Sequence, residues 1–326
     1  MSNRHEGTSE GPRIRLGVST CLLGEPVRYD GGHKRDPFLV NELGRYVEWV
    51  PVCPEVEMGL ATPRESMRLV GDPDVPRLVA PKSGTDYTDG MTAWAHRRVE
   101  ELAGEDLHGF VFKKDSPSSG LFRVRVYDER GMAQRVGVGM FARAFTERFP
   151  LLPVEEEGRL HDAYLRENFI DRIFTYQRWT AMLRDEGTPG GLVAFHTAHK
   201  LTLMAHSPAH YRQMGRLVAQ AGTLPWKDLA SQYATLLMAG LRAIATPGRH
   251  YNVLQHAMGF VKDDLEPADK AELLGLMEDY RRELVPLIVP ITLLKHHLAR
   301  NPVPAWIHQQ VYLNPYPKEL MLRNHV

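Results

Sequence analysis

Three short apolar stretches in the first half of the chain each run into a polar loop. IRLGVST leads to Cys21, YVEWVPV leads to Cys53, and GFVF at residues 109–112 leads to the loop KKDSPSSG. Short apolar runs bounded by turn residues are typical of buried strands. Strands that all end in polar loops favour an α/β sheet with a site at its carboxyl edge.

One helix is expected between these strands. TDGMTAWAHRRVEELAG has a helical period, with Thr88 and Asp89 near its N-terminus and Gly104 past its end. We therefore expect an α/β domain over residues 13–150. The preceding residues 1–12, MSNRHEGTSEGP, lack the apolar core of a signal peptide and are expected to be a disordered leader.

The second half of the chain has a helical period throughout. Apolar side chains such as Leu160 and Phe169 fall near one stripe, until the sequence GTPGG interrupts the pattern. From Leu192 onward, helical patterns alternate with Pro and Gly and no strand pattern occurs. We expect a helical linker over residues 151–187 and an all-α C-terminal domain over residues 188–326.

Composition and charge narrow the class of protein. The chain has 326 residues, of which 43% are hydrophobic, so it can bury two moderate cores. Lys plus Arg and Asp plus Glu number 40 each. The chain therefore lacks a global basic signature for nucleic acid, although a neutral total is compatible with one basic face. No apolar run is long enough to span a bilayer. We expect a cytoplasmic protein without membrane contact, and the sequence does not predict its oligomeric state.

The chain has two cysteines, Cys21 and Cys53, each placed at the end of a predicted strand. A structural disulfide is not expected in a cytosolic protein. The two thiols are therefore either buried core side chains or ligands of a metal group.

The loops around these cysteines resemble a known family. STCLLGEPVRYDGGHK, VPVCPEVEMGLATPR and KKDSPSSG together resemble motifs of the 2-thiouracil desulfidase (TudS) family, over about residues 13–150. The resemblance implies a 4Fe–4S cluster held by three cysteines, with one iron open to take the sulfur of a thiolated base. Cys21 and Cys53 match the first two ligands. The third ligand position falls at Ser119, where the family motif reads Ser-Pro-Ser-Cys-Gly.

The serine at position 119 leaves several interpretations open. Iron–sulfur clusters need soft thiolate ligands, whereas a serine oxygen is hard and ionises far less readily. Ser119 could bind iron weakly in a labile cluster, or the chain could be a loss-of-function form. Alternatively, water or a nearby residue such as Asp115 could complete the site. We favour a cluster site that is impaired or unusually labile.

Removal of sulfur from a pyrimidine needs water at the thiocarbonyl carbon, a group that moves protons and an acceptor for the sulfide. An open iron would be the Lewis acid and the sulfur acceptor. Glu55, two residues after Cys53, is the best candidate for the general acid and base. Ser116 can hydrogen-bond the substrate or relay a proton, and the resemblance implies the same pair.

Other polar side chains of these loops are candidates for binding the base, namely Arg28, Tyr29, Asp30, Arg64 and Ser118. Arg28 and Asp30 could orient the base or close the VRYDGG loop, while Tyr29 or Trp94 could stack on it. Simpler explanations stay open. Ser116 and Ser118 fit ordinary turn and helix-cap hydrogen bonds, and Arg28 and Arg64 fit surface ion pairs.

Three motifs of the second half resemble the YbgA-like domain from about residue 190 to the end. They are FHTAHKLTLMAHSPAHYRQMGRLVA, RHYNVLQHAMGFVK and YLNPYPKELMLRN. A YbgA-like domain that follows a TudS domain in one chain resembles the arrangement of the tRNA 4-thiouridine desulfidase (RudS) family. The resemblance implies that the helical domain binds thiolated tRNA while the α/β domain removes the sulfur. Candidate phosphate contacts are Lys200, His206, Arg212, Arg216, Arg249 and Lys262, although a solvated surface explains each one singly.

Two pairs of histidines stand at helical spacing, His196 with His199 and His206 with His210. Such pairs can hold zinc. No cysteine or clear carboxylate partner stands nearby, and Ser207-Pro208 is expected to start a new helix. Capping, core packing or a polar surface is therefore the expected role.

Two rival functions stay open. The first is a desulfidase of small thiolated pyrimidines such as free thiouracil, with the helical domain used for oligomerisation. The second is a non-catalytic RNA-binding protein whose cluster site has decayed at Ser119.

Overall fold

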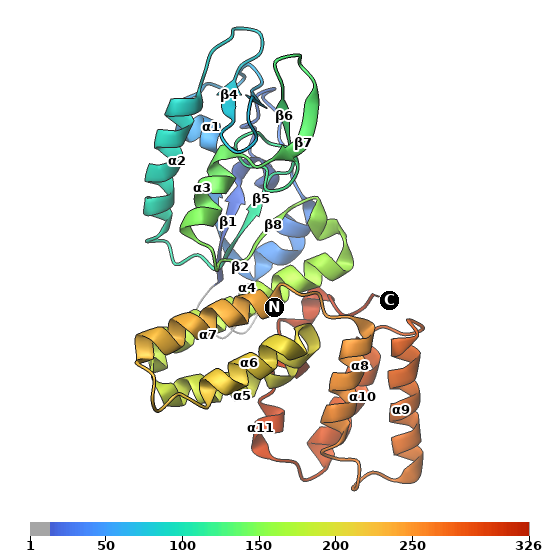
Figure 1. Cartoon of the computed structure of the whole chain (residues 1–326). Coiled ribbons are helices and arrows are strands. Elements are labelled where there is room, and N and C mark those ends of the chain that lie inside the picture. The colour runs from blue at the N-terminus through green and yellow to red at the C-terminus, as the bar shows by residue number, and fades with distance from the viewer. Residues whose placement is uncertain (1–13, 326) are drawn as a thin grey trace, which may run out of the picture. The chain divides into compact units, whose positions relative to one another are not determined.

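The computed structural model of the protein describes residues 14–325, so the predicted leader at residues 1–12 lies outside the described residues. The chain divides into two compact units, the first ending at Gly158 and the second beginning at Arg159. The first unit contains two sheets with helices and the second is helical (Figure 1). The predicted fold class, an α/β domain followed by an all-α domain, is confirmed.

A four-stranded parallel sheet forms the centre of the first unit. Its strand order is β2-β1-β5-β8, with β1 at Ile14–Ser19, β2 at Val47–Val52, β5 at Gly109–Phe112 and β8 at Val154–Glu156. The first three are the strands expected from the apolar runs. The fourth lies in the segment for which we predicted a helical linker, so the sheet continues beyond residue 150.

Aromatic side chains fill the space between this sheet and α3 (Met140–Arg148). Phe110 and Phe112 of β5 lie against Phe145 of α3, with ring centroids 4.8 Å and 5.6 Å apart. The helix α2 (Thr88–Leu102), predicted from its period, packs beside α3 (Figure 1). Gly17 of β1 has to be glycine, because a Cβ there would lie 2.0 Å from the Phe110 ring.

The second sheet has the order β4-β3-β6-β7. Its strands are β3 at Arg68–Val70, β4 at Arg77–Val79, β6 at Val124–Tyr127 and β7 at Ala133–Gly137. The strands β6 and β7 pair antiparallel, and β3 pairs parallel with β6. One turn of helix, α1 (Pro54–Glu57), follows β2.

Helices make up the second unit. They are α4 (Ala163–Glu186), α5 (Pro189–His206), α6 (Pro208–Val218), α7 (Trp226–Leu241), α8 (Pro247–Met258), α9 (Pro267–Arg281), α10 (Ile288–Arg300) and α11 (Ala305–His308). Several begin with a polar cap followed by proline. Ser207, for example, accepts a hydrogen bond from the His210 backbone N–H at the start of α6, where we expected a new helix. None of the helices in residues 14–325 is long and apolar enough to cross a bilayer.

Candidate active site

A pocket of about 350 Å³ lies at the loops that follow the carboxyl ends of the parallel strands. Cys21 lies in the 3-10 turn that follows β1, Cys53 comes directly after β2, and Ser119 lies in the loop after β5. All three line the pocket. Ser19 pairs in register with Val52, so β1 and β2 end side by side. The parallel order of the strands is therefore what brings together three residues that are far apart in the sequence.

Both thiols are buried and neither is in a disulfide. Burial raises the pKa of Cys21 to about 11, although the nearby Lys113 and Arg28 cations act in the opposite direction. Burial and the Glu55 carboxylate raise the pKa of Cys53 to about 12. In the metal-free chain, both thiols therefore hold their protons at neutral pH, and a metal group has to displace these protons to bind.

The loop after β5 is a tight turn held by its own serines. The Ser116 hydroxyl accepts a hydrogen bond from the Ser119 backbone N–H at 3.1 Å, and the Ser116 carbonyl accepts one from the Gly120 N–H at 2.8 Å. Gly120 permits this approach, because a Cβ there would lie 2.7 Å from the Ser116 carbonyl oxygen. Ser116 therefore has the turn role considered for it, and it also lines the pocket.

Glu55 is fixed beside Cys53 by two partners. Its Oε1 accepts a 2.5 Å hydrogen bond from the Ser118 hydroxyl, and its Oε2 lies 3.6 Å from Arg64 Nη2. The same Oε2 is 3.6 Å from the Cys53 sulfur. Ser118 is fully buried, with its Oγ 2.9 Å from the Ser116 Oγ. The structure thus places Glu55 in the pocket, with Ser118 supporting it from outside the lining.

Arg64 is a structural anchor as well as a pocket residue. Its side chain is only 10% exposed, and Nη1 donates to the Val27 carbonyl at 3.0 Å and to Thr62 Oγ1 at 3.1 Å. A surface ion pair, the simpler explanation for Arg64, therefore does not fit its burial. The guanidinium therefore connects the loop after β1 with the short helix α1, which carries Glu55.

The mouth of the pocket carries Arg28 and Tyr29. Tyr29 is 45% exposed, and the Arg28 guanidinium lies 5.3 Å from the centre of its ring. Asp30 does not line the pocket. Its Oδ1 accepts from the Gly32 N–H at 3.0 Å, and this bond lowers the pKa of Asp30, so Asp30 closes the turn. Trp94 is buried against Phe141 and cannot stack on a base.

Two glutamates that sequence reasoning missed hold both ends of the loop after β5. Glu157 forms an ion pair with Lys113 and accepts a hydrogen bond from the Lys114 backbone N–H at 2.7 Å. Glu156 Oε1 accepts from the backbone N–H groups of Leu121 at 2.8 Å and Phe122 at 3.0 Å. Glu156 is 2% exposed, and burial raises its pKa. Successive residues at the end of β8 therefore set the shape of the loop that presents Ser119.

The donors that line the pocket fit the expected 4Fe–4S cluster only partly in chemistry. Among residues 14–325, no group of three or more His, Cys, Asp or Glu side chains is placed to hold a metal ion. Cys21 and Cys53 offer two soft donors, and Ser119 adds a hydroxyl to the same pocket. The Asp115 carboxylate, considered as a substitute ligand, pairs with Arg135 at 3.0 Å. The chain's own donor set is thus two thiolates and one oxygen.

Most of the cationic candidates for RNA contact lie at or near the surface of the helical domain. Arg212, Arg216 and Lys262 are exposed. Lys200 is half-buried, with its ammonium 5.1 Å from the centre of the Trp306 ring.

Arg249 has a structural role. Its guanidinium donates to the His206 carbonyl at 2.7 Å and to the Ile244 carbonyl at 3.3 Å, so it stabilises the C-terminal end of α5.

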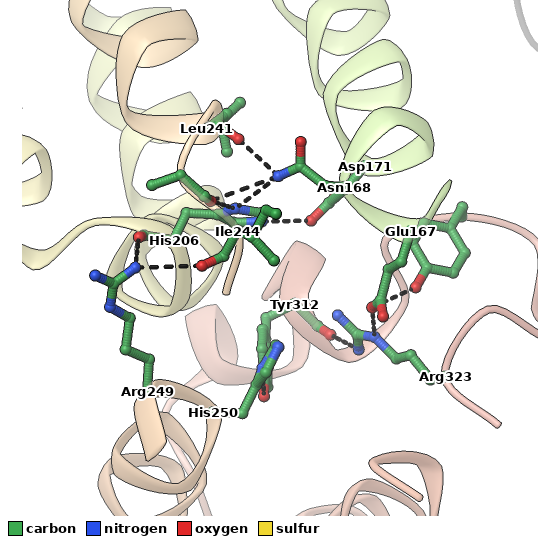
Figure 2. Close-up of polar contacts among 12 residues, drawn as sticks. Glu167, Asn168, Asp171, His206, Leu241, Ile244, Arg249, His250, Tyr312 and Arg323 are labelled. Carbon is green, nitrogen blue, oxygen red and sulfur yellow. Dashed lines mark hydrogen bonds and ion pairs between the residues drawn. The ribbon is translucent and has the colours of Figure 1, made fainter. Parts of the chain in front are cut away.

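His206, predicted as a phosphate contact, is instead buried in the helical domain. Figure 2 shows its ring pointing to Asp171, with Nε2 3.0 Å from the carboxylate and Nδ1 2.7 Å from the Ala243 carbonyl. Asp171 is the carboxylate partner that sequence reasoning missed, because it lies on α4, far away in the chain. His199 is also buried, and burial lowers its pKa to about 3, which fits the expected core role.

Comparison with known proteins agrees with this division of the chain. Residues 16–157 match the 2-thiouracil desulfurase family, and residues 200–317 match the family described as protein of unknown function DUF1722. The chain is 33% identical over 161 residues to the uncharacterized protein YbgA of Escherichia coli, which covers 48% of this chain and 94% of YbgA. It is also 29% identical over 108 residues to the uncharacterized protein YbbK of Bacillus subtilis, which covers 32% of this chain and 71% of YbbK.

One solved structure also matches. It is the 4Fe–4S-dependent thiouracil desulfidase TudS, with 30% sequence identity and a TM-score of 0.39, over 46% of this chain and 94% of that chain. By its sequence matches, the chain belongs to the YbgA family, and it carries a domain of the thiouracil desulfidase family in front of its helical DUF1722 domain.

Proposed function

We propose that this chain removes sulfur from 4-thiouridine in tRNA. The observation that carries the proposal is the placement of Glu55, hydrogen-bonded to Ser118 and 3.6 Å from the Cys53 sulfur, in the pocket that Cys21 and Ser119 also line. A fixed carboxylate beside a candidate metal ligand is the arrangement that desulfuration needs. The 2-thiouracil desulfurase match over residues 16–157 supports the reaction class.

The overall reaction exchanges one atom of the base. Water hydrolyses the thiocarbonyl group at C4 to a carbonyl group and releases hydrogen sulfide, with no net oxidation. The water oxygen forms a bond to C4 and gives up two protons, and the C–S bond breaks with both protons leaving on sulfur. Glu55 is the group that takes a proton from water and returns it to the leaving sulfur. Ser118 and Arg64 hold the carboxylate for this role.

Cys21, Cys53 and Ser119 would hold the cluster that the family match implies. When bound, such a cluster supplies a Lewis acid and an acceptor for the sulfur. Because one of the three donors is an oxygen, we propose that the cluster of this chain is labile or only partly loaded. Lys113 stays close to Cys21 and favours its thiolate form.

The charge of the pocket supports a polyanionic substrate. Its lining includes five cationic side chains, Arg28, Lys34, Arg64, Lys113 and Lys114, against three acidic ones, Glu55, Glu65 and Asp115. Arg28, Arg64 and Lys113 are paired with the carboxylates of Asp30, Glu55 and Glu157. A nucleotide in RNA carries a phosphate on each side of the base, and it would be attracted mainly by Lys34 and Lys114. The target base has to leave its stack to enter, and the exposed Tyr29 ring at the mouth is placed to stack on it.

The second candidate function is a desulfidase of free thiolated bases, because the N-terminal domain matches the 2-thiouracil desulfurase family, which is named for a free base. Anaerobically reconstituted protein can be given thiolated tRNA and free 2-thiouracil at equal concentration of sulfur, with sulfide release measured. We expect tRNA to be turned over with the higher kcat/KM. Sulfide release from 2-thiouracil but not from tRNA would support the second candidate. If iron-loaded protein releases sulfide from neither substrate, the remaining interpretation is a non-catalytic RNA-binding protein.

A further inference from the structure

The helical domain has a cavity of its own. It is a cleft of about 460 Å³ between α10 and residues 313–324. Most of its lining comes from the motif YLNPYPKELMLRN, whose conformation the desulfidase chemistry does not explain. The volume is in the range of sites that bind small organic groups.

The floor of this C-terminal cleft is apolar and fixed. Ile291 of α10 and the side chains of Leu313 and Leu322 are buried at 2%, 7% and 5% exposure. Arg323 also lines the cleft, and its guanidinium donates to Glu167 at 3.1 Å and to the Tyr312 carbonyl at 2.7 Å (Figure 2). Because Arg323 is 6% exposed and paired, it holds the motif in place and contributes little free charge to the cleft.

The rim of the cleft is polar and has an excess of cations. Lys295 donates to Asn314 Oδ1 at 2.6 Å and keeps two further N–H donors. The exposed Lys318 has no ion-pair partner among residues 14–325, and Glu319 is the acidic side chain of the lining. The rim therefore offers two ammonium groups against one carboxylate, together with the amides of Asn314 and Asn324.

We infer that the C-terminal cleft binds one nucleotide of an RNA strand. Its base lies on the apolar floor, and the adjoining phosphates contact Lys295 and Lys318. An apolar floor bordered by cations and amides suits an unstacked base with its charged backbone. The ammonium groups bind an internal phosphate as well as a terminal one, because they act as point charges. The inference rests on the proposed tRNA substrate and deepens it by locating a contact surface.

The test compares binding of labelled tRNA by the full-length chain and two double variants. In the first variant, Lys295→Ala and Lys318→Ala remove the rim charges. In the matched control, Lys227→Ala and Lys270→Ala remove two surface lysines that do not line the cleft. Circular dichroism and thermal melting confirm that each variant folds. Fluorescence anisotropy at several salt concentrations gives the affinity and its salt slope.

We expect the rim variant to bind tRNA about tenfold more weakly, and its log–log salt slope to fall by about 0.7 for each phosphate that the protein no longer neutralises. The control should change less than twofold, and sulfide release from free 2-thiouracil should stay the same in both variants. A folded rim variant that binds tRNA like wild type overturns the cleft inference alone. Wild-type protein that binds no tRNA overturns both the cleft and the tRNA substrate. If uridine monophosphate binds and only its binding is abolished in the rim variant, the cleft holds a free nucleotide and the RNA inference is wrong.

Discussion

The Ser118 hydroxyl donates a 2.5 Å hydrogen bond to the Glu55 carboxylate, across 63 positions of sequence. This bond joins the loop after β5 to the short helix after β2. Ser119, the next residue, lines the pocket and is the proposed third ligand. The acid/base candidate and the third ligand position are therefore coupled through one serine, and a shift of this loop displaces both.

Glu55 is expected to act in proton transfer and not in metal binding. Glu55→Gln keeps the side-chain shape and an oxygen that accepts from Ser118, but it cannot exchange a proton. We expect kcat for sulfide release to fall by about 10²–10⁴-fold, with iron content unchanged. Glu65→Gln is a matched control, because Glu65 lines the same pocket while its carboxylate accepts from the Ser83 backbone. Full turnover by iron-loaded Glu55→Gln protein would remove Glu55 from the mechanism.

The two cysteines are expected to be cluster ligands. Cys21→Ser or Cys53→Ser would leave a single thiolate, which cannot hold a cubane. We expect both variants to lose the brown chromophore and the bound iron and sulfide after anaerobic reconstitution, while their circular dichroism stays native. If either variant keeps its full iron and sulfide, the thiols are ordinary core side chains.

The raised pKa values of the thiols predict how the metal-free chain responds to pH. Burial raises the pKa of Cys21 from the ordinary value of about 9 to about 11. The folded chain therefore keeps a proton that the unfolded chain releases between these values, and the free energy of unfolding falls as pH rises through this window. We expect iodoacetamide to label the folded chain more slowly than the unfolded chain at pH 8, and labelling to keep accelerating up to pH 10. A rise in the labelling rate of less than about twofold between pH 9 and pH 10 would show a thiol with the ordinary pKa and would contradict a raised one.

Glu156 is expected to stabilise the loop that presents Ser119. Glu156→Ala would leave the buried N–H of Leu121 without its carboxylate acceptor, at a cost of about 1–3 kcal/mol, and would also remove the bond from the part-buried N–H of Phe122. We expect a lower midpoint of denaturant unfolding and a lower iron content. Glu156→Gln keeps a carbonyl oxygen and should recover most of both. Equal loss in the two variants would mean that the two N–H groups are not the cause.

The strands and the edge on which the site lies follow from the sequence. Apolar runs ending at Cys21, at Cys53 and at the KKDSPSSG loop fix three strands, and parallel strands present their ends together. The strand β8 was missed because VEE carries two acids, whose burial depends on bonds to the loop and could not be expected from local pattern.

The partners of the site residues were harder to predict. Ser118 fits a turn by its local sequence, and only the fold places it against Glu55. The burial of His206 depends on Asp171, which lies 35 residues earlier on another helix. Such pairs follow from tertiary packing, whereas periodicity and motif spacing describe local structure.

Ser119 is expected to limit how much cluster this chain can hold. Ser119 is nearly isosteric with cysteine and 4% exposed, so Ser119→Cys should leave the fold unchanged. A thiolate there would replace the hard oxygen donor with the soft one that iron–sulfur clusters need. The most direct measurement is iron and sulfide per chain after anaerobic reconstitution, followed by sulfide release from thiolated tRNA. We expect both iron content and activity to rise together in Ser119→Cys protein. A wild-type chain that already holds a full, air-stable cluster with the same turnover would contradict the claim.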